Sequence, residues 1–259
     1  MPNLTGRVAI VTGAAHGIGR AIALVLAERG ALVWACDVRE RELAETGRVL
    51  AKVAGAAAKT ARVDVTATEQ VTELVRRVAA SDGDVEILVN CAGGVADQTA
   101  RPVEDVSDDD WHTIFRVNVD AAFCFTRAVV PGMKRRGRGA IVNISSGAGR
   151  SYSRTGIQAY ASAKAAVIGL TRQTARELGR FGVRVNSVAP GFVLSNPATE
   201  RQWAALGEDG QRVMLESIAL GRIGEPHEIA SVVAFLVSDE ASYVTGQTLS
   251  ADGGHWMLG

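Results

Sequence analysis

The sequence is poor in cysteine, and the three cysteines that it has lie far apart. Cys36, Cys91 and Cys124 are odd in number and show no CxxC spacing. That pattern argues against both a disulfide framework and a zinc site. The acidic run 108–110 is interpreted as a helix start, so no metal is expected. A chain of 259 residues can bury a large core without such cross-links.

The sequence also lacks net charge and long apolar runs. Its 28 basic and 28 acidic residues cancel, so nothing in the charge balance indicates nucleic acid or an anionic membrane as a partner. The basic run 134–138 is interpreted as a solvated helix end. The apolar run 21–27 is far too short to span a bilayer, and the first residues do not resemble a signal peptide. We therefore expect a cytoplasmic protein that acts on a small molecule.

Short apolar runs alternate with segments of helical periodicity along the whole chain. The composition is 47% hydrophobic but only 5% aromatic, which suits buried parallel strands. This alternation predicts a parallel sheet with helices on both faces, in one domain over residues 1–259. Strands are expected at 8–12, 31–37, 60–65, 86–93, 139–146 and 183–190, with a short last strand within 246–254. Helices are expected at 18–30, 39–53, 68–80, 107–131, 159–179 and 225–238.

A glycine-rich loop, TGAAHGIG, connects the first predicted strand to the first helix. Gly13 can make the tight turn, Gly17 allows the backbone close to a pyrophosphate, and Gly19 allows the helix to pack on the strand. The helix start offers free N–H groups to an anion. The alternative is a plain strand–helix turn, but the flanking elements favour a dinucleotide site.

Polar residues stand at the ends of the next strands. Asp37 can accept hydrogen bonds from an adenosine ribose, or can serve as a helix N-cap. Its charge would repel a 2′-phosphate by about 4 kcal/mol at 4 Å and an effective dielectric of 20. NAD is therefore expected rather than NADP, although Arg39 partly offsets the repulsion. Further residues expected at the adenosine rim are Asp64, Asn90, Ala92 and Gly93.

Tyr160 and Lys164 are four residues apart on a predicted helix, so their side chains share one face. The ammonium group, together with the positive charge of an oxidised nicotinamide, is expected to lower the phenol pKa from ~10 toward ~7, which needs roughly 4 kcal/mol. Tyr160 could then act as general base toward an alcohol, or as general acid toward a ketone. A serine at the fifth strand end could hold the substrate oxygen. The alternative is an ordinary surface pair.

These motifs together resemble the short-chain dehydrogenase/reductase family. TGAAHGIG, NCAG, ISS, YASAK and APGFV match it over residues 7 to about 254. The resemblance implies a Rossmann-type doubly wound fold, a nicotinamide cofactor, a homotetramer contacting through helices like 107–131 and 159–179, and a catalytic set of Asn118, Ser146, Tyr160 and Lys164. Ser146 precedes Tyr160 by 14 residues, one more than is usual in the family. The resemblance also implies cofactor contacts from the following residues: His16, Ile18, Val65, Tyr160, Lys164, Pro190, Gly191, Val193 and Ser195.

The substrate-facing segments are polar and locally basic. The loop after Ser146 and a covering segment at about 195–225 carry the residues expected to contact substrate: Arg150, Arg154, Asn196 and Arg201. This lining predicts a small hydroxylated substrate such as a sugar, a polyol or a sugar acid, unless the arginines face solvent. The alternatives are reduction of a 3-oxoacyl thioester and an inactive cofactor-binding sensor. His255 and Trp256 either reach a site, across a subunit interface in one arrangement, or only pack there, and packing is the expectation.

Overall fold

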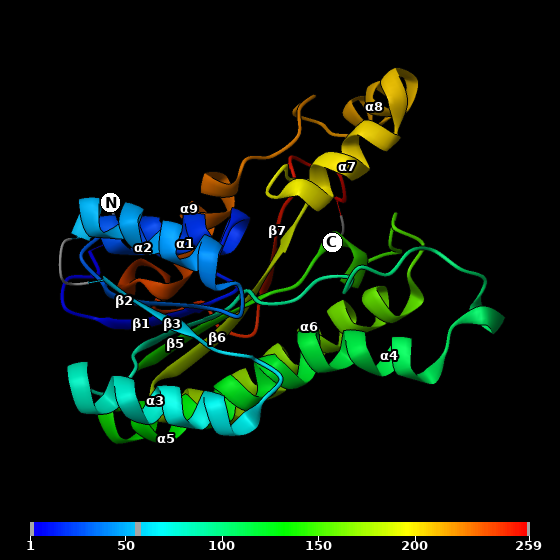
Figure 1. The fold of residues 1–259 in the computed structure, drawn as a ribbon. Coiled ribbons are helices and arrows are strands. Elements are labelled where there is room, and N and C mark those ends of the chain that lie inside the picture. The colour runs from blue at the N-terminus through cyan, green and yellow to red at the C-terminus, as the bar shows by residue number, and fades with distance from the viewer. Residues whose placement is uncertain (1–2, 55–57, 258–259) are drawn as a thin grey trace.

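The computed structural model describes residues 3–54 and 58–257, and a seven-stranded parallel sheet forms its centre (Figure 1). The strand order is β3-β2-β1-β4-β5-β6-β7, and every neighbouring pair is parallel. The order reverses between β1 and β4, and ligands of such sheets bind beyond the carboxyl ends at this switch point. The strands are β1 (Val8–Thr12), β2 (Leu32–Asp37), β3 (Ala58–Arg62), β4 (Ile87–Asn90), β5 (Gly139–Ile144), β6 (Val183–Pro190) and β7 (Thr248–Ala251).

Helices cover both faces of the sheet, as the doubly wound prediction required (Figure 1). One face carries α1 (Gly17–Glu28), α2 (Glu40–Ala54) and α9 (Pro226–Val237). The opposite face carries α3 (Thr68–Asp82), α5 (Ala121–Arg136) and α6 (Gln158–Leu178), with α4 (Asp108–Phe115) packed on α6. Two further helices, α7 (Pro197–Ala205) and α8 (Gly207–Glu216), project beyond the carboxyl ends of the strands.

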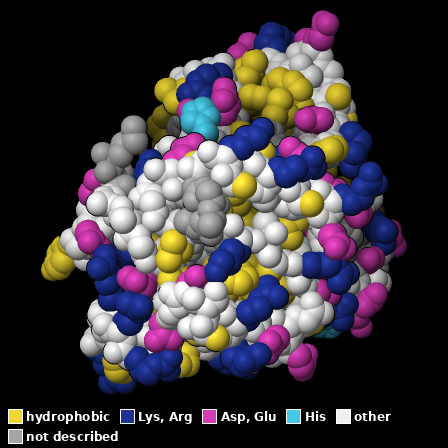
Figure 2. Space-filling model, turned by 60° about the vertical axis from the view of Figure 1, so that its left-hand side comes forward, with side chains coloured by type: hydrophobic (Ala, Val, Ile, Leu, Met, Phe, Trp, Pro, Cys, Tyr) yellow, Lys and Arg dark blue, Asp and Glu magenta, His cyan; other side chains and the backbone are white. Residues whose placement is uncertain are grey.

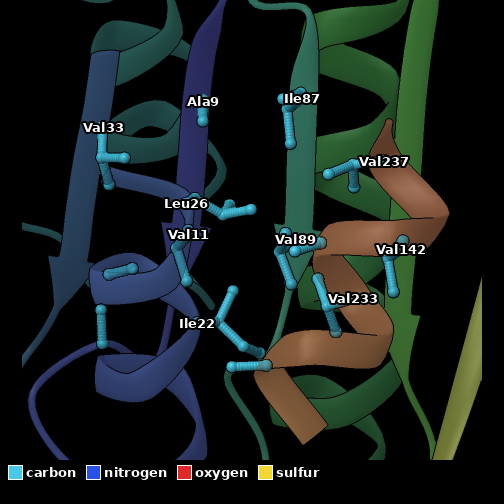
Figure 3. Close-up of a cluster of buried hydrophobic side chains, with 14 of the residues drawn as sticks. Ala9, Val11, Ile22, Leu26, Val33, Ile87, Val89, Val142, Val233 and Val237 are labelled. Carbon is cyan, nitrogen blue, oxygen red and sulfur yellow. The ribbon is translucent and has the colours of Figure 1, made fainter. Parts of the chain in front are cut away.

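The buried core explains why each strand is apolar on both sides. Figure 3 shows the layer between the sheet and the first helical face, where Ile22 and Leu26 of α1 meet Val233 and Val237 of α9. The strands contribute small branched or short side chains to the same layer: Ala9, Val11, Val33, Ile87, Val89 and Val142. Their neighbours in sequence point to the other face and form the second layer with α3, α5 and α6. Two apolar layers hold the strand ends rigidly, and loops at those ends can carry chemistry.

The predicted elements are confirmed, but several of their boundaries are wrong. The third strand ends at Arg62, short of Asp64, because the Asp64 carboxylate accepts hydrogen bonds from the Thr66 N–H and hydroxyl and turns the chain. The fourth and fifth strands end earlier than predicted, at Asn90 and Ile144. The covering segment expected at about 195–225, for which no helix was predicted, contains α7 and α8.

The helix predicted over 107–131 is interrupted. Ser107 caps α4 as expected, by accepting a hydrogen bond from the Asp110 N–H at 3.1 Å. A π-helical turn, Arg116–Asp120, then separates α4 from α5. Single π turns within helices frequently mark functional positions.

Some of the predicted range cannot be compared. Residues 1–2, 55–57 and 258–259, which the expected domain 1–259 includes, lie outside the described part of the chain. Over the residues that are described, no helix has the length and apolar character needed to cross a membrane.

Candidate functional site

The loop between β1 and α1 has the geometry of an anion cradle. Gly13 and Gly17 have φ values of +67° and +57°, which side chains rarely tolerate. A Cβ on Gly13 would lie 2.8 Å from the backbone N and Cα of Ala92, and a Cβ on Gly19 would strike the Gly13 carbonyl. Helix α1 begins at Gly17 without a side-chain cap and without an acidic residue in its first turn. Its N-terminal N–H groups therefore suit a pyrophosphate.

Asp37 ends β2 and is held toward this loop. Its carboxylate accepts hydrogen bonds from the Ala15 N–H and the Arg39 N–H, both at 3.0 Å. The side chain is nearly buried, so its orientation is restricted. Burial and the Arg39 charge lower the pKa of neighbouring His16 below its usual value, which keeps that ring neutral near pH 7. These features fit the adenosine side of a nicotinamide dinucleotide.

The segment after β6 returns to the same loop. Pro190 ends β6, and Val193 pairs with Gly224 in an isolated parallel bridge. A Cβ on Gly17 would lie 2.5 Å from the Ser195 carbonyl oxygen. Gly191 packs as closely on Asp252, where a Cβ would lie 2.8 Å from its Cα. The glycine-rich loop and the segment after β6, both predicted to contact the cofactor, are therefore adjacent in space at Gly17 and Ser195.

The remaining predicted cofactor residues occupy different positions. Gly93 has a φ of +148° and lies against Asn118 and Lys164. Asn90 is buried and donates to the Asn143 side chain at 2.8 Å, away from the rim. Three others lie at or below the rim, and their roles stay predictions: Ile18 and Val65, which pack partly against the two core layers, and Asp64, which organises its own turn.

Lys164 is a buried ammonium group at the centre of the site. It is 5% exposed, and its Nζ donates to the Ile144 carbonyl oxygen at 3.0 Å. Burial lowers the pKa of Lys164 to about 8. Its Nζ lies 5.7 Å from the centroid of the Tyr160 ring, so the predicted pair does share one face of α6.

Tyr160 differs from the prediction in the direction of its pKa. Burial raises the pKa of the phenol, and the hydrogen bond with Ser146 opposes that shift only in part. The Lys164 ammonium therefore does not by itself produce the predicted lowering of the phenol pKa. The free energy lost when a phenolate is removed from water exceeds the stabilisation from the Ser146 hydrogen bond. Tyr160 is consequently a neutral hydrogen-bond donor across the physiological pH range.

Two serines connect the end of β5 to this pair. Ser145 is buried and donates to the Lys164 carbonyl oxygen at 2.8 Å, which joins β5 to α6. Ser146 starts a 3-10 turn, Gly147–Gly149, and its Oγ accepts from the Ala148 N–H at 3.2 Å. The two hydroxyls thus have different roles: Ser145 fixes α6 to the end of β5, and Ser146 faces Tyr160.

Asn118 lies within the π turn and reaches across to the loop after β4. Its amide donates to the Gly94 carbonyl at 2.8 Å and to the Ile114 carbonyl at 2.9 Å, and its Oδ1 accepts from the Gly94 N–H at 3.0 Å. The side chain is 2% exposed. The π turn places this amide against Gly93 and Gly94, and Gly93 also borders Lys164.

The four residues expected to contact substrate do not form one basic pocket. Arg150 donates to the Ser250 hydroxyl at 2.8 Å and the Thr248 carbonyl at 3.3 Å, so its guanidinium is engaged with β7. Arg154 is exposed and donates to the Ser217 hydroxyl at 3.4 Å. Asn196 caps α7, and Arg201 lies exposed on that helix.

Aromatic side chains, in contrast, lie at the turn that follows Ser146. Trp256 lies against Gly147, and its ring stands edge-on to Tyr152 at 5.3 Å. Phe192 and Trp203 form a second pair at 5.8 Å between the segment after β6 and α7. Trp256 was expected to pack, with contact to a site as the alternative, and its contact with Gly147, the residue after Ser146, was not predicted. The two residues are far apart in the chain, and no local pattern joins them.

Comparisons with known proteins agree with this geometry. A family model described as enoyl-(acyl carrier protein) reductase matches residues 13–255. The 3-oxoacyl-[acyl-carrier-protein] reductase FabG of Thermotoga maritima is 40% identical, over 97% of this chain and 98% of its own. The Escherichia coli K12 FabG is 37% identical, over 99% and 100%. The solved structure of levodione reductase, 32% identical, superposes with a TM-score of 0.90 over 97% of this chain and 98% of its own.

The chain belongs to the short-chain dehydrogenase/reductase family. It is accordingly a nicotinamide-dependent oxidoreductase that acts on CH–OH or keto groups.

Proposed function

We propose that the chain reduces 3-oxoacyl thioesters to 3-hydroxyacyl thioesters, with NADH as the preferred reductant. The observation that carries this proposal is the geometry after β5, where the Trp256 indole packs on Gly147 and the preceding residue, Ser146, faces the partly buried, protonated Tyr160 phenol. A neutral phenol is the form that can donate a proton to a ketone oxygen. The names of the FabG relatives support an acyl thioester as the substrate.

The catalytic roles follow from the contacts of each side chain. The Ser146 and Tyr160 hydroxyls hold the ketone oxygen, and Tyr160 gives it a proton. Lys164, fixed by the Ile144 carbonyl, stabilises the tyrosinate that remains. Asn118 positions the Gly93–Gly94 loop beside Lys164. The reduced nicotinamide, when bound, supplies the hydride.

The cofactor is held by this chain's own residues at both ends of the site. The Gly13–Gly19 loop receives the pyrophosphate, and Asp37 accepts hydrogen bonds from the adenosine ribose. Lys164 and the segment from Pro190 to Ser195 contact the nicotinamide half. The Asp37 carboxylate disfavours a 2′-phosphate, which supports NADH over NADPH.

The contacts of Arg150 argue against a sugar or sugar acid as the substrate. The expectation of a sugar or sugar acid depended on loop arginines facing the ketone, yet Arg150 is engaged with β7. Next to Ser146, the Trp256 indole packs on Gly147 and meets the Tyr152 ring edge-on. An acyl thioester therefore suits the lining better than a polyol. Residues 195–225 would cover this substrate.

The test is an absorbance assay with NADH and, separately, NADPH. The reduction assays use a four-carbon and an eight-carbon 3-oxoacyl thioester. Two assays test the alternatives: reduction of a 2-enoyl thioester, and oxidation of free sugars or polyols with NAD⁺. We expect turnover of the 3-oxo compounds, faster with NADH. Tyr160→Phe should lose about 10²–10⁴-fold in kcat and retain NADH binding. Turnover restricted to the enoyl thioester or to sugars would refute the proposal.

We also propose that the chain is a homotetramer. Phe123 on α5 is 46% exposed, although it is a large apolar side chain on a helix expected at the subunit interface. Light scattering should give the mass of four 27.2 kDa chains. A monomeric mass at micromolar concentration would contradict this proposal.

A further inference from the structure

We propose that Trp256 is a specificity-determining residue, whose indole ring forms an apolar wall beside Ser146 against which the substrate's acyl chain packs. This inference rests on the proposed function. It starts from the turn that follows β7. The Asp252 carboxylate accepts hydrogen bonds from the Gly254 N–H at 3.0 Å and the Trp256 N–H at 3.1 Å. Gly253 and Gly254, with φ values of +66° and +79°, allow the chain to reverse there. The turn therefore presents Trp256 from a defined backbone position.

The ring lies directly on the catalytic loop. A Cβ on Gly147 would be 3.2 Å from Cδ1 and 3.3 Å from Nε1 of Trp256. Gly147 is the residue after Ser146, so the indole packs one residue from the serine that faces Tyr160. A side chain at position 147 would have to displace the ring. The close approach thus depends on this glycine.

The aromatic surface continues from Gly147 through Trp256 to the exposed Tyr152 ring. Trp256 is only partly buried, and Tyr152, which meets it edge-on, is 63% exposed. An exposed large aromatic ring beside a reaction centre is more informative than an isolated surface side chain. Methylene groups gain free energy by packing on such a face, whereas hydroxyl groups would lose water contacts there. The wall therefore favours alkyl chains.

The tail also contacts the end of the covering segment. The His255 ring nitrogen Nδ1 and the Ser217 hydroxyl are 3.2 Å apart, just after α8. A Cβ on Gly253 would lie 2.8 Å from the Ile218 side chain. Figure 2 shows apolar side chains gathered at the upper end of one face, level with α7 and α8 in Figure 1. The indole thus lies between the catalytic loop and the cover, where an acyl chain would leave the ketone.

The experiment compares Trp256→Ala and Trp256→Phe with the wild type, on the four-carbon and the eight-carbon 3-oxoacyl thioester. We expect Trp256→Ala to raise KM for the longer substrate about tenfold or more, with a smaller rise for the shorter one and kcat within about twofold. Trp256→Phe should retain most of the length preference. Met257→Ala, at a neighbouring side chain that is 79% exposed, is the matched control and should change neither constant.

Equal losses of kcat on both substrates, or no change on either, would overturn the role of Trp256. Melting temperature and NADH binding establish that each variant is folded. Failure of the proposed function has a different signature, because the wild type itself would then turn over no thioester. In that case, a short and a long methyl ketone replace the thioesters, and the same KM pattern decides the role of Trp256.

Discussion

Replacing Lys164 with Met tests the central electrostatic feature of the site. Methionine keeps an unbranched side chain of similar reach but removes the buried charge. The pKa of Lys164 is lowered from the model-compound value of 10.5 to about 8, which means that folding disfavours the charged form. At pH 7 this cost is about 3 kcal/mol, since each unit of pKa corresponds to 1.36 kcal/mol.

Removing the buried charge should therefore stabilise the folded protein. Part of this stabilisation is lost because Met cannot make the hydrogen bond to the Ile144 carbonyl. An unpaired buried carbonyl costs about 1–3 kcal/mol. We therefore expect Lys164→Met to be as stable as the wild type or more stable by about 1–2 kcal/mol at pH 7, while reductase activity is abolished. Most buried substitutions destabilise instead.

The pH dependence is the sharper part of the prediction. Between pH 8 and 10.5 the unfolded wild type binds more protons at this lysine than the folded protein does, so wild-type stability rises with pH. The advantage of Lys164→Met should shrink by about 2 kcal/mol from pH 7 to pH 9.5.

Urea unfolding at fixed protein concentration, followed by far-UV circular dichroism, measures this change. Lys52→Met, at an exposed lysine on α2, is the matched control and should show no such trend. A difference between Lys164→Met and the wild type that stays constant with pH would refute the reasoning.

Three further predictions concern the cofactor, the loop and the pH profile. Asp37→Ser should reduce the ratio of kcat/KM for NADH to that for NADPH by roughly 10²–10³-fold, because it removes a charge worth about 4 kcal/mol against a 2′-phosphate; an unchanged ratio would place the ribose elsewhere. Arg150→Ala should lower the free energy of unfolding by about 1–2 kcal/mol, because its hydrogen bonds to β7 are lost. The KM values for neutral and for anionic substrates should both stay at their wild-type levels. A KM rise confined to anionic substrates would restore the predicted substrate role of Arg150. The reduction rate should fall as pH rises through about 8, as Lys164 loses its proton, and a rate flat to pH 10 would contradict that role.

Much of the fold was accessible from local patterns. Periodicity and the alternation of elements predicted the parallel sheet with helices on both faces, since a buried strand and an amphipathic helix each carry their own signature. The phosphate loop was predictable for a similar reason, because Gly13 and Gly17 occupy positions where the backbone needs positive φ. Tyr160 and Lys164 were placed together by helical spacing alone.

Boundaries and interruptions were less accessible. The π turn around Asn118 leaves no clear mark in a continuous helical pattern. The hydrogen bonds that accompany it join the Asn118 side chain to Gly94, which lies 24 residues earlier in the chain. The third strand ended early because the Asp64 side chain competes with the strand ladder.

What the sequence by itself determined is the class of fold, the anion loop and the spacing of the Tyr160–Lys164 pair, because each depends on residues a few positions apart. Only the tertiary structure decided that Arg150 faces β7, about a hundred residues later in the chain, and that Trp256 lies on Gly147. It also decided the direction of the Tyr160 pKa, since burial depends on every element packed around the ring. Charge and hydrogen-bonding types are written in the sequence, but their solvation is a property of the folded chain.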